Sequence, residues 1–216
     1  MSRRRHPLVA AARERGVRDR RVLAAIGAVD RCRFVPTDQR HRADADAPVP
    51  IARSQVTTQP SLVAQMVAAL DLDGSARVLE VGTGLGYQAA VLARLAAEVV
   101  TVERHRDLAQ AAQHNLIAAG VDNVEVVVTD GSRGWPERAP YDAIIVAAAF
   151  PDVPEPLVQQ LRDGGRLVQP LGPGGAEEVV CLRRTGGHLE PVGTVTLARF
   201  VRLVGEHGHR TDRARP

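Results

Sequence analysis

The sequence contains no lysine: all 28 of its basic residues are arginine. Without lysine there is no GxxxxGK[ST] motif, which excludes the phosphate-binding loop of ATPases. Only two cysteines are present, Cys32 and Cys181, and they form no CxxC pair, so the sequence predicts neither a disulfide framework nor a zinc cluster. Uninterrupted apolar runs of the roughly 20 residues that span a bilayer are also missing, and no long apolar run opens the sequence. We therefore expect a cytoplasmic protein without a membrane partner.

Positive charge is concentrated near the N-terminus. The chain of 216 residues carries a net charge of +3, yet residues 1–21 hold eight arginines against only Glu14 and Asp19, while residues 22–205 are mildly acidic. We interpret residues 1–21 as a solvated, partly frayed start and expect no nucleic-acid partner. A chain of 216 residues with 44% hydrophobic content suits one globular domain.

Strand and helix patterns alternate through the middle of the chain. Apolar runs without alternation are typical of parallel strands that are buried on both faces. We predict strands at 76–82, 98–104, 124–130, 141–148 and 165–171, with helices at 87–96, 107–119 and 155–161. The sequence therefore indicates an α/β fold: a doubly wound, mostly parallel sheet.

Both ends of the chain depart from this alternation. Helical patterns cover 20–29 and begin again near Pro60, and the segment between them reads as an irregular connection. Beyond Gly172 two further strand patterns follow, which we interpret as an antiparallel pair at the sheet edge. We accordingly divide a single domain into an N-terminal helical segment that faces the substrate (1–74), a cofactor-binding core (75–172), antiparallel edge strands (173–204, with runs at 177–184 and 195–204) and a flexible tail (205–216).

A glycine loop follows the first strand of the core. Gly82, Gly84 and Gly86 alternate between a predicted strand and a predicted helix, so a ligand can approach the backbone closely there. Tyr87 breaks the G-x-G-x-x-G spacing of dinucleotide sites, which makes NAD or FAD a poor fit. The loop is therefore typical of a site for another nucleotide-like ligand.

Acidic residues accompany the ends of three successive predicted strands: Glu80, Glu103 and Asp130. A carboxylate at the position of Glu103 can accept hydrogen bonds from both ribose hydroxyls. Such acids favour a ligand with cationic groups and hydroxyls over a pyrophosphate, and S-adenosylmethionine has a sulfonium, an ammonium and a ribose. A salt bridge or helix cap is the alternative for Glu80, and a solvated strand end beside Arg104 is the alternative for Glu103. We predict this set of cofactor-binding residues: Glu80, Gly82, Thr83, Gly84, Gly86, Glu103, Asp130 and Gly131.

Motifs from about residue 20 to residue 204 resemble the protein-L-isoaspartate (D-aspartate) O-methyltransferase family. The matching segments are RFVP (33–36), PVPI (48–51), SQVTTQP (54–60), VLEVGTGLGYQAAVLA (78–93), VERHRDLA (102–109), DNVEVVVTDGSRGWPERAPYDAIIVAAA (122–149), VPEPLVQQLRDGGRLVQPLG (153–172) and ARFVRL (198–203). The resemblance implies a class I S-adenosylmethionine-dependent methyltransferase fold with a seven-stranded sheet. It also implies methyl transfer to the α-carboxylate of L-isoaspartyl, and possibly D-aspartyl, residues in damaged proteins, which starts repair through a succinimide.

The resemblance also implies substrate residues, and here the chain departs from the family. The family's pocket segment usually reads GQTISQP, and its serine is treated as the active-site residue; Thr58 takes that place, and Val56 and Thr57 replace the usual Thr and Ile. Other departures are Val146–Ala149 in place of VTAA, and Arg199–Leu203, where RFVRL replaces RFVPL. The resemblance thus implies Thr58 as the catalytic residue and Val56, Thr57, Thr58, Ala147 and Val201 as substrate-binding residues. The alternative for Thr58 is an N-cap of the helix that begins at Pro60.

The implied reaction needs neither a general base nor a metal. A carboxylate with a pKa of about 4 is already ionised at pH 7, so positioning of two bound reactants suffices. His207 and His209 could bind a metal, but we interpret their Gly- and Arg-rich surroundings as a solvated tail and predict no metal site. We expect a monomer with isoaspartyl proteins or peptides as partners.

Other functions remain open at this stage. The altered pocket also fits a relative that methylates ordinary aspartate in a dedicated ribosomal peptide. A nucleic-acid methyltransferase needs an Asn/Asp-Pro-Pro-aromatic loop where this chain reads AAAFPDVP. Metal-dependent methylation of a small molecule lacks an evident acid cluster, and a binding protein that has lost its chemistry is the non-enzymatic alternative.

Overall fold

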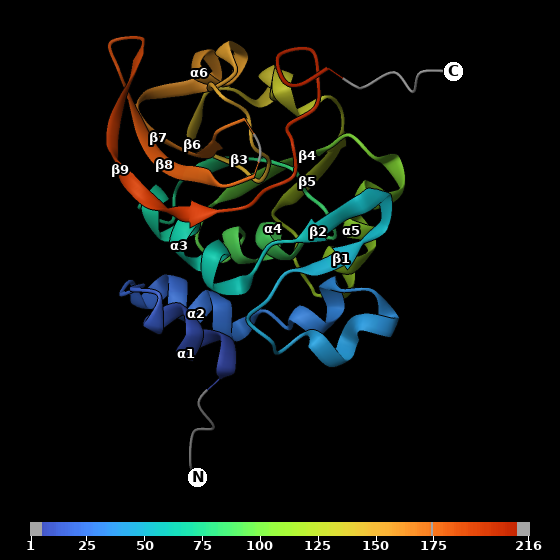
Figure 1. Cartoon of the computed structure of the whole chain (residues 1–216). Helices are drawn as coiled ribbons and strands as arrows, with labels where there is room; N and C mark the ends of the chain where they lie inside the picture. The colour runs from blue at the N-terminus through green and yellow to red at the C-terminus, as the bar shows by residue number, and fades with distance from the viewer. Residues whose placement is uncertain (1–5, 174, 211–216) are drawn as a thin grey trace.

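A single seven-stranded sheet forms the centre of the computed structural model, which describes residues 6–173 and 175–210. The strands are β3 (Arg77–Val81), β4 (Glu98–Glu103), β5 (Val124–Val128), β6 (Tyr141–Val146), β7 (Leu161–Leu171), β8 (Glu177–Thr185) and β9 (His188–Ala198). Their order in space is β5-β4-β3-β6-β7-β8-β9 (Figure 1). The first five are parallel, whereas β8 and β9 pair antiparallel at one edge. The predicted α/β class, with its mostly parallel sheet and C-terminal antiparallel pair, is confirmed.

Two hydrophobic clusters cover the two faces of the sheet. The helices are α1 (Pro7–Glu14), α2 (Arg20–Ala28), α3 (Pro60–Leu70), α4 (Tyr87–Leu92), α5 (Arg106–Ala118) and α6 (Glu155–Gln160). The first five contribute to the cluster on one face, whereas α6 belongs to the cluster on the other. Successive residues of β3 point to opposite faces, since Val78 joins the first cluster and Leu79 the second. Burial on both faces explains why the sequence of these strands is apolar without alternation.

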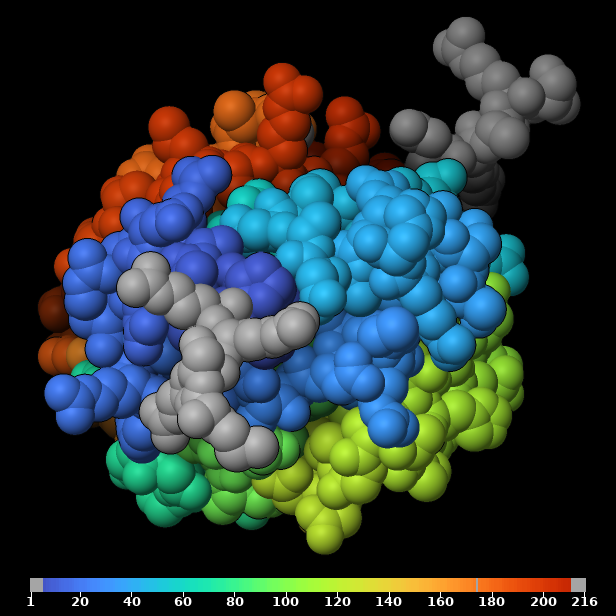
Figure 2. Space-filling view, turned by 90° about the horizontal axis from the view of Figure 1, so that it is seen from below, coloured from blue at the N-terminus to red at the C-terminus, as the bar shows by residue number. Residues whose placement is uncertain are grey.

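The N-terminal segment packs on the sheet domain instead of fraying. Helix α1 buries Leu8 and Ala12, which lie four positions apart on one helix face, and it contacts α3. Val17, beyond the helix, is also buried. The interpretation of residues 1–21 as a solvated start is therefore wrong for the part from α1 onward, while residues 1–5 lie outside the described residues. Figure 2 shows the blue N-terminal part forming much of the face seen from below.

A short hairpin lies in the segment for which an irregular connection was predicted. Strands β1 (Val49–Ile51) and β2 (Gln55–Thr57) pair antiparallel, with Val49 opposite Thr57. The turn between them places Arg53 and Ser54 at φ values of 61° and 55°. Strands of three residues carry little periodicity, and this turn has no glycine at its left-handed positions, so no local pattern predicts the hairpin.

The last strand also differs from its predicted position. A strand pattern at 195–204 was expected, but β9 ends at Ala198 and begins at His188. The turn before it uses Gly186 and Gly187 at φ values of 57° and 90°, as tight hairpin turns require. Beyond β9 the chain forms parallel bridge pairing between Arg202 and Ala149, just beyond β6. The strand-like pattern of residues 199–204 therefore belongs to a segment at the carboxyl edge of the sheet.

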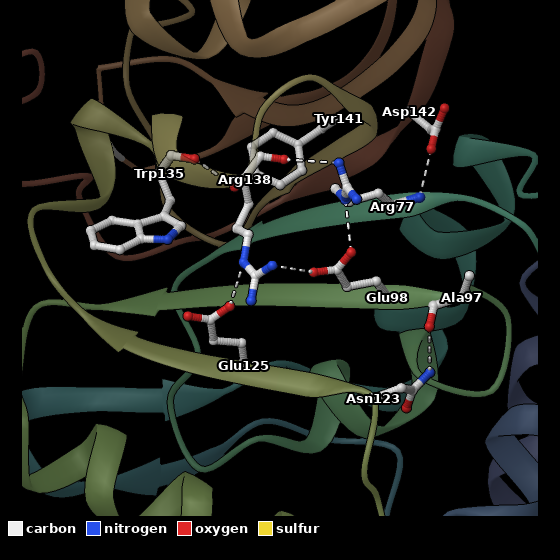
Figure 3. A network of polar contacts seen from close by, with 9 residues as sticks. All are labelled: Arg77, Ala97, Glu98, Asn123, Glu125, Trp135, Arg138, Tyr141 and Asp142. Carbon is white, nitrogen blue, oxygen red and sulfur yellow. Dashed lines mark hydrogen bonds and ion pairs between the residues drawn. The ribbon is translucent and has the colours of Figure 1, made fainter.

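Ion pairs join the opposite, amino edge of the sheet. Arg77 Nε lies 2.8 Å from Glu98 Oε2, and Arg138 Nε lies 3.0 Å from Glu125 Oε2 (Figure 3). The Arg77 backbone N–H also donates to Asp142 at 2.6 Å. These contacts tie together residues near the amino ends of four neighbouring strands, while the other ends of the strands carry the candidate site.

Candidate functional site

The carboxyl edge of the sheet contains a hollow at the point where the strand order reverses. From β3 the chain continues to β4 and β5 on one side, and then returns to β6 on the other side. In open α/β sheets ligands bind at such a switch point. We call this hollow the edge cavity; its lining includes Thr57, Thr58, Gly82, Thr83, Gly84, Tyr87, Glu103, Gly131, Ala147, Val201, Arg202 and Leu203.

The glycine loop supplies one wall of the edge cavity. Gly82, Gly84 and Gly86 all have left-handed φ values, at 99°, 55° and 95°. A side chain at any of the three would strain the backbone, and at Gly82 a Cβ would also lie 3.3 Å from the Ala147 Cβ. The loop therefore keeps its backbone close to whatever occupies the cavity, although of these glycines only Gly82 and Gly84 line it.

Glu103 presents a buried carboxylate at the cavity wall. Its side chain is only 6% exposed, and its two oxygens accept hydrogen bonds from Gly84 N and His105 N, each at 3.0 Å. These bonds fix the carboxylate orientation but leave lone pairs free. The alternative of a solvated strand end beside Arg104 is therefore wrong.

Glu80 lies behind the cavity wall and does not line it. Glu80 is fully buried, and Thr101 Oγ1 donates to its Oε2 at 2.5 Å, while Thr101 Oγ1 and Thr83 Oγ1 lie 2.6 Å apart. Burial raises the pKa of Glu80 to about 8, so the carboxyl is neutral at pH 7. Glu80 contacts the cavity through Thr101 and Thr83, and its role in cofactor binding stays a prediction. No ion pair of Glu80 occurs within residues 6–173 and 175–210, which also removes the salt-bridge alternative.

Asp130 holds the C-terminal segment instead of facing the cavity. Its carboxylate accepts hydrogen bonds from Ser132 N at 3.0 Å, Ser132 Oγ at 2.7 Å and Glu206 N at 2.7 Å. Burial acts to raise the pKa of Asp130, but these bonds outweigh it and hold the pKa below its usual value. The Asp130 carboxylate therefore holds the C-terminal segment, and its role in cofactor binding stays a prediction; its neighbour Gly131 does line the cavity.

The same contacts correct the expectation of a flexible tail from residue 205. His207 N donates to Ser132 Oγ at 3.0 Å, and the His209 ring packs edge-on against Phe150 with centroids 5.1 Å apart. Residues 205–207 are therefore docked on the loop after β5, and His209 packs on the segment after β6; residues 211–216 lie outside the described residues. The described part of the chain holds no cluster of three or more possible metal ligands.

The predicted substrate residues gather at one rim of the cavity. A second hollow, which we call the outer groove, shares Val56, Thr58, Ala147 and Val201 with the edge cavity. Its other lining residues are Arg15, Pro48, Gln59, Ser61, Leu62, Gln65, Thr196, Leu197, Ala198, Arg199 and Phe200. Thr57 lines only the edge cavity, and its hydroxyl accepts a hydrogen bond from Arg31 at 3.1 Å. The residues shared by both hollows therefore mark the place where the two adjoin.

Thr58 is not the cap of α3. The N-cap position is Gln59, without a side-chain cap bond, and Asp46 instead accepts from Ser61 N at 2.8 Å and from Gln59 Nε2 at 2.7 Å. The cap alternative for Thr58 is therefore wrong, and the Thr58 side chain borders both hollows.

Arg31 and Asp46 support the site and were missed by the sequence analysis. Arg31 is 2% exposed and donates to the carbonyl oxygens of Ala43, Ala45 and Ala47 as well as to Thr57. Its guanidinium also lies 5.7 Å from the ring centroid of Tyr87, which lines the edge cavity. No local motif marks these partners, since Arg31 reaches them over 12 to 26 positions of sequence.

Comparison with known proteins identifies the family. The family model described as protein-L-isoaspartate (D-aspartate) O-methyltransferase matches residues 3–208. The chain belongs to this family. Among curated relatives named protein-L-isoaspartate O-methyltransferase, one from Methanoculleus marisnigri is 50% identical over 91% of this chain and 89% of its own. Another, from Rhodopseudomonas palustris, is 52% identical over 90% of this chain and 89% of its own.

Solved structures agree with the fold. A protein-L-isoaspartate O-methyltransferase superposes with a TM-score of 0.80 at 29% identity, covering 93% of this chain and 65% of that chain. A Plasmodium falciparum protein described as a putative member, in complex with S-adenosyl-L-homocysteine, gives a TM-score of 0.77 at 22% identity over 92% of this chain and 98% of that chain.

No helix within the described residues of this chain is long and apolar enough to cross a membrane.

Proposed function

We propose that this protein transfers the methyl group of S-adenosylmethionine to the α-carboxylate of L-isoaspartyl residues in damaged proteins and peptides, and that D-aspartyl residues are further substrates. The observation that carries the proposal is that the two hollows adjoin. Thr58, Ala147 and Val201 border both the edge cavity, whose lining includes Glu103 and the glycine loop, and the outer groove, where we place the polypeptide. Family membership supports the same activity.

The edge cavity contains groups that suit S-adenosylmethionine. Glu103 supplies a buried carboxylate for the ribose hydroxyls. Gly82 and Gly84 leave the backbone open on one wall, and the hydroxyl of Thr83 is oriented by Thr101 and Glu80. When bound, this cofactor supplies an electrophilic methyl group on a sulfonium.

The substrate carboxylate needs orientation and not deprotonation. Since it is ionised at pH 7, no residue has to act as a base. We assign Thr58 as the hydroxyl that hydrogen-bonds this carboxylate, and Val56, Thr57, Ala147 and Val201 as the surrounding wall. The position of Val201 is fixed because its carbonyl accepts from Ala149 N at 2.7 Å, and Leu203 N donates to Ala149 O at 2.8 Å. Held between these groups, the carboxylate reacts by proximity and alignment. The backbone nitrogen of the following residue then attacks the methyl ester and methanol leaves, which forms a succinimide; water opens this ring partly to normal aspartate.

Methyl incorporation into paired peptides tests the proposal. An isoaspartyl peptide and its aspartyl twin are incubated with radiolabelled S-adenosylmethionine, and base-labile label is counted. We expect label on the isoaspartyl peptide only. Label on the aspartyl twin alone would instead support an enzyme for a dedicated ribosomal peptide, a candidate favoured by threonine at position 58 where the family usually has serine.

We also propose that the enzyme works as a monomer in the cytoplasm. Both hollows are lined within one chain, so the site needs no second copy. Sedimentation equilibrium that gives a dimer mass at micromolar concentration would contradict the monomer, and cell fractionation tests the compartment.

A further inference from the structure

A third hollow adjoins the edge cavity and the outer groove at Val201. This hollow, the flanking groove, is lined by Ser54, Gln55, Arg104, Gly175, Phe200, Val201, Arg202 and Val204. Val201 also lines the edge cavity and the outer groove. A polypeptide whose damaged residue enters the edge cavity beside Thr58 therefore has two adjoining grooves for its neighbouring residues.

Arginine is the charged residue of these two grooves. Arg15 and Arg199 line the outer groove, and Arg104 and Arg202 line the flanking groove. All four side chains are exposed. None of them forms an ion pair within residues 6–173 and 175–210, whereas surface arginines elsewhere do, as Arg53 does with Asp107. Their charges therefore remain available to a bound molecule.

Acidic residues are missing from the same surface. Among the described residues, no aspartate or glutamate lines either groove, and the edge cavity contributes only the buried Glu103. This pattern is local, because residues 22–205 hold 21 acids against 17 arginines. A mildly acidic body thus carries a cationic rim around its site, and such a rim attracts anionic polypeptides.

The grooves also expose apolar surface. Val56 is 42% exposed and Leu197 is 72% exposed, and both line the outer groove. Exposed apolar side chains between unpaired arginines suit an extended polypeptide and not a small polar ion.

We propose that Arg15, Arg199, Arg104 and Arg202 select isoaspartyl polypeptides that carry aspartate or glutamate within a few residues of the damaged site. The inference rests on the proposed function and specifies its substrate class. Arg202 stands where the motif that this segment resembles has proline, since RFVPL reads RFVRL in this chain.

Three peptides of one length test the selection. They share a central isoaspartyl residue and differ only at two positions on each side, which hold glutamate, glutamine or lysine. We expect kcat/KM to be about tenfold higher for the glutamate peptide than for the lysine peptide at low salt, since each exposed ion pair contributes a factor of up to about five. The difference should lie in KM, because flanking contacts bind ground state and transition state alike. At about 1 M salt, where the screening length is about 3 Å, the preference should largely disappear.

Charge-reversal variants assign the preference to the grooves. Arg199→Glu and Arg202→Glu should each reduce the ratio of glutamate to lysine peptide several-fold. Arg20→Glu is the matched control: Arg20 is exposed on α2 and lines none of the three hollows, so its variant should keep the ratio. Calorimetric binding of S-adenosylhomocysteine to each variant checks that the edge cavity is intact.

Three results would overturn the inference. Equal kcat/KM for the three peptides would refute the selection and leave the proposed function intact. An Arg20→Glu effect on the ratio as large as that of Arg199→Glu would likewise refute the selection and leave the proposed function intact. Absence of turnover on every isoaspartyl peptide would instead refute the proposed function, and the inference with it.

Discussion

Glu80 should make the stability of this protein fall as the pH rises through neutrality. The carboxyl is fully buried, and burial raises its pKa from an ordinary value of 4.5 to about 8. Below pH 4.5 the carboxyl is protonated in the folded and unfolded states alike, so its titration costs the fold nothing. Between these two pKa values the unfolded chain releases the proton while the folded chain retains it. A rise in pH within this range therefore lowers the free energy of unfolding.

The size of the effect follows from the shift. One proton difference changes the free energy of unfolding by about 1.4 kcal/mol per pH unit. Between pH 6 and pH 8 the group therefore lowers the stability by about 2 kcal/mol, with the slope fading near pH 8 as the folded state also ionises. Glu80→Gln keeps the shape and the bond from Thr101 but cannot ionise. The variant should therefore gain about 2 kcal/mol relative to the unmodified protein between pH 6 and pH 8.

Urea unfolding followed by circular dichroism at pH 6, 7, 8 and 9 measures this difference. Glu190→Gln, at an exposed position on β9, serves as the control, and its free energy of unfolding should change with pH as that of the unmodified protein does. If the free energy of unfolding of Glu80→Gln also changes with pH in the same way at all four values, the carboxyl is ionised in the fold and the reasoning from burial is refuted.

Three further substitutions test the site and its support. Glu103→Ala should weaken S-adenosylhomocysteine binding by about 3 kcal/mol, or roughly a hundredfold, because two charge-assisted bonds to the ribose are lost; unchanged calorimetric affinity would remove Glu103 from the cofactor site. Thr58→Ala should lower kcat/KM for an isoaspartyl peptide about tenfold with cofactor affinity unchanged, and Thr58→Ser should restore activity; equal losses of both quantities would indicate a structural role. Asp46→Ala removes the acceptor for Ser61 N and should lower the free energy of unfolding by about 1–2 kcal/mol, whereas exposed Asp44→Ala should not; the same small effect from both would show that Asp46 does not cap α3.

The sheet was predictable because its signals are local. Residues such as Val78, Leu79 and Ile144 lie in apolar runs that are buried on both faces, and the glycine loop marks the switch point directly. The antiparallel pair was expected for similar reasons, and only the limits of its second strand were wrong. The chain leaves the sheet after Ala198, but residues 195–204 have a strand-like composition on both sides of that point, so the sequence does not mark the end of β9.

The roles of two acids could not be predicted from spacing. Glu80 and Asp130 both stand near strand ends, as cofactor ligands often do, but the side chain of one turns into the core and that of the other toward the C-terminal segment. Such choices depend on partners far away in sequence: Thr101 for Glu80 and Glu206 for Asp130. The hairpin β1–β2 was hidden for the same reason, since Arg31 supports it from a distance.

The docking of residues 205–207 on Asp130 and Ser132 has a practical consequence for handling the protein. Gly205 lies so close that a Cβ there would fall 1.9 Å from Asp130 Oδ1. The backbone at Gly205 therefore packs directly against Asp130, and the residue after Asp130, Gly131, lines the edge cavity. Truncation or fusion of the chain should therefore leave residues 205–207 in place, because these residues contact the loop that lines the ligand site.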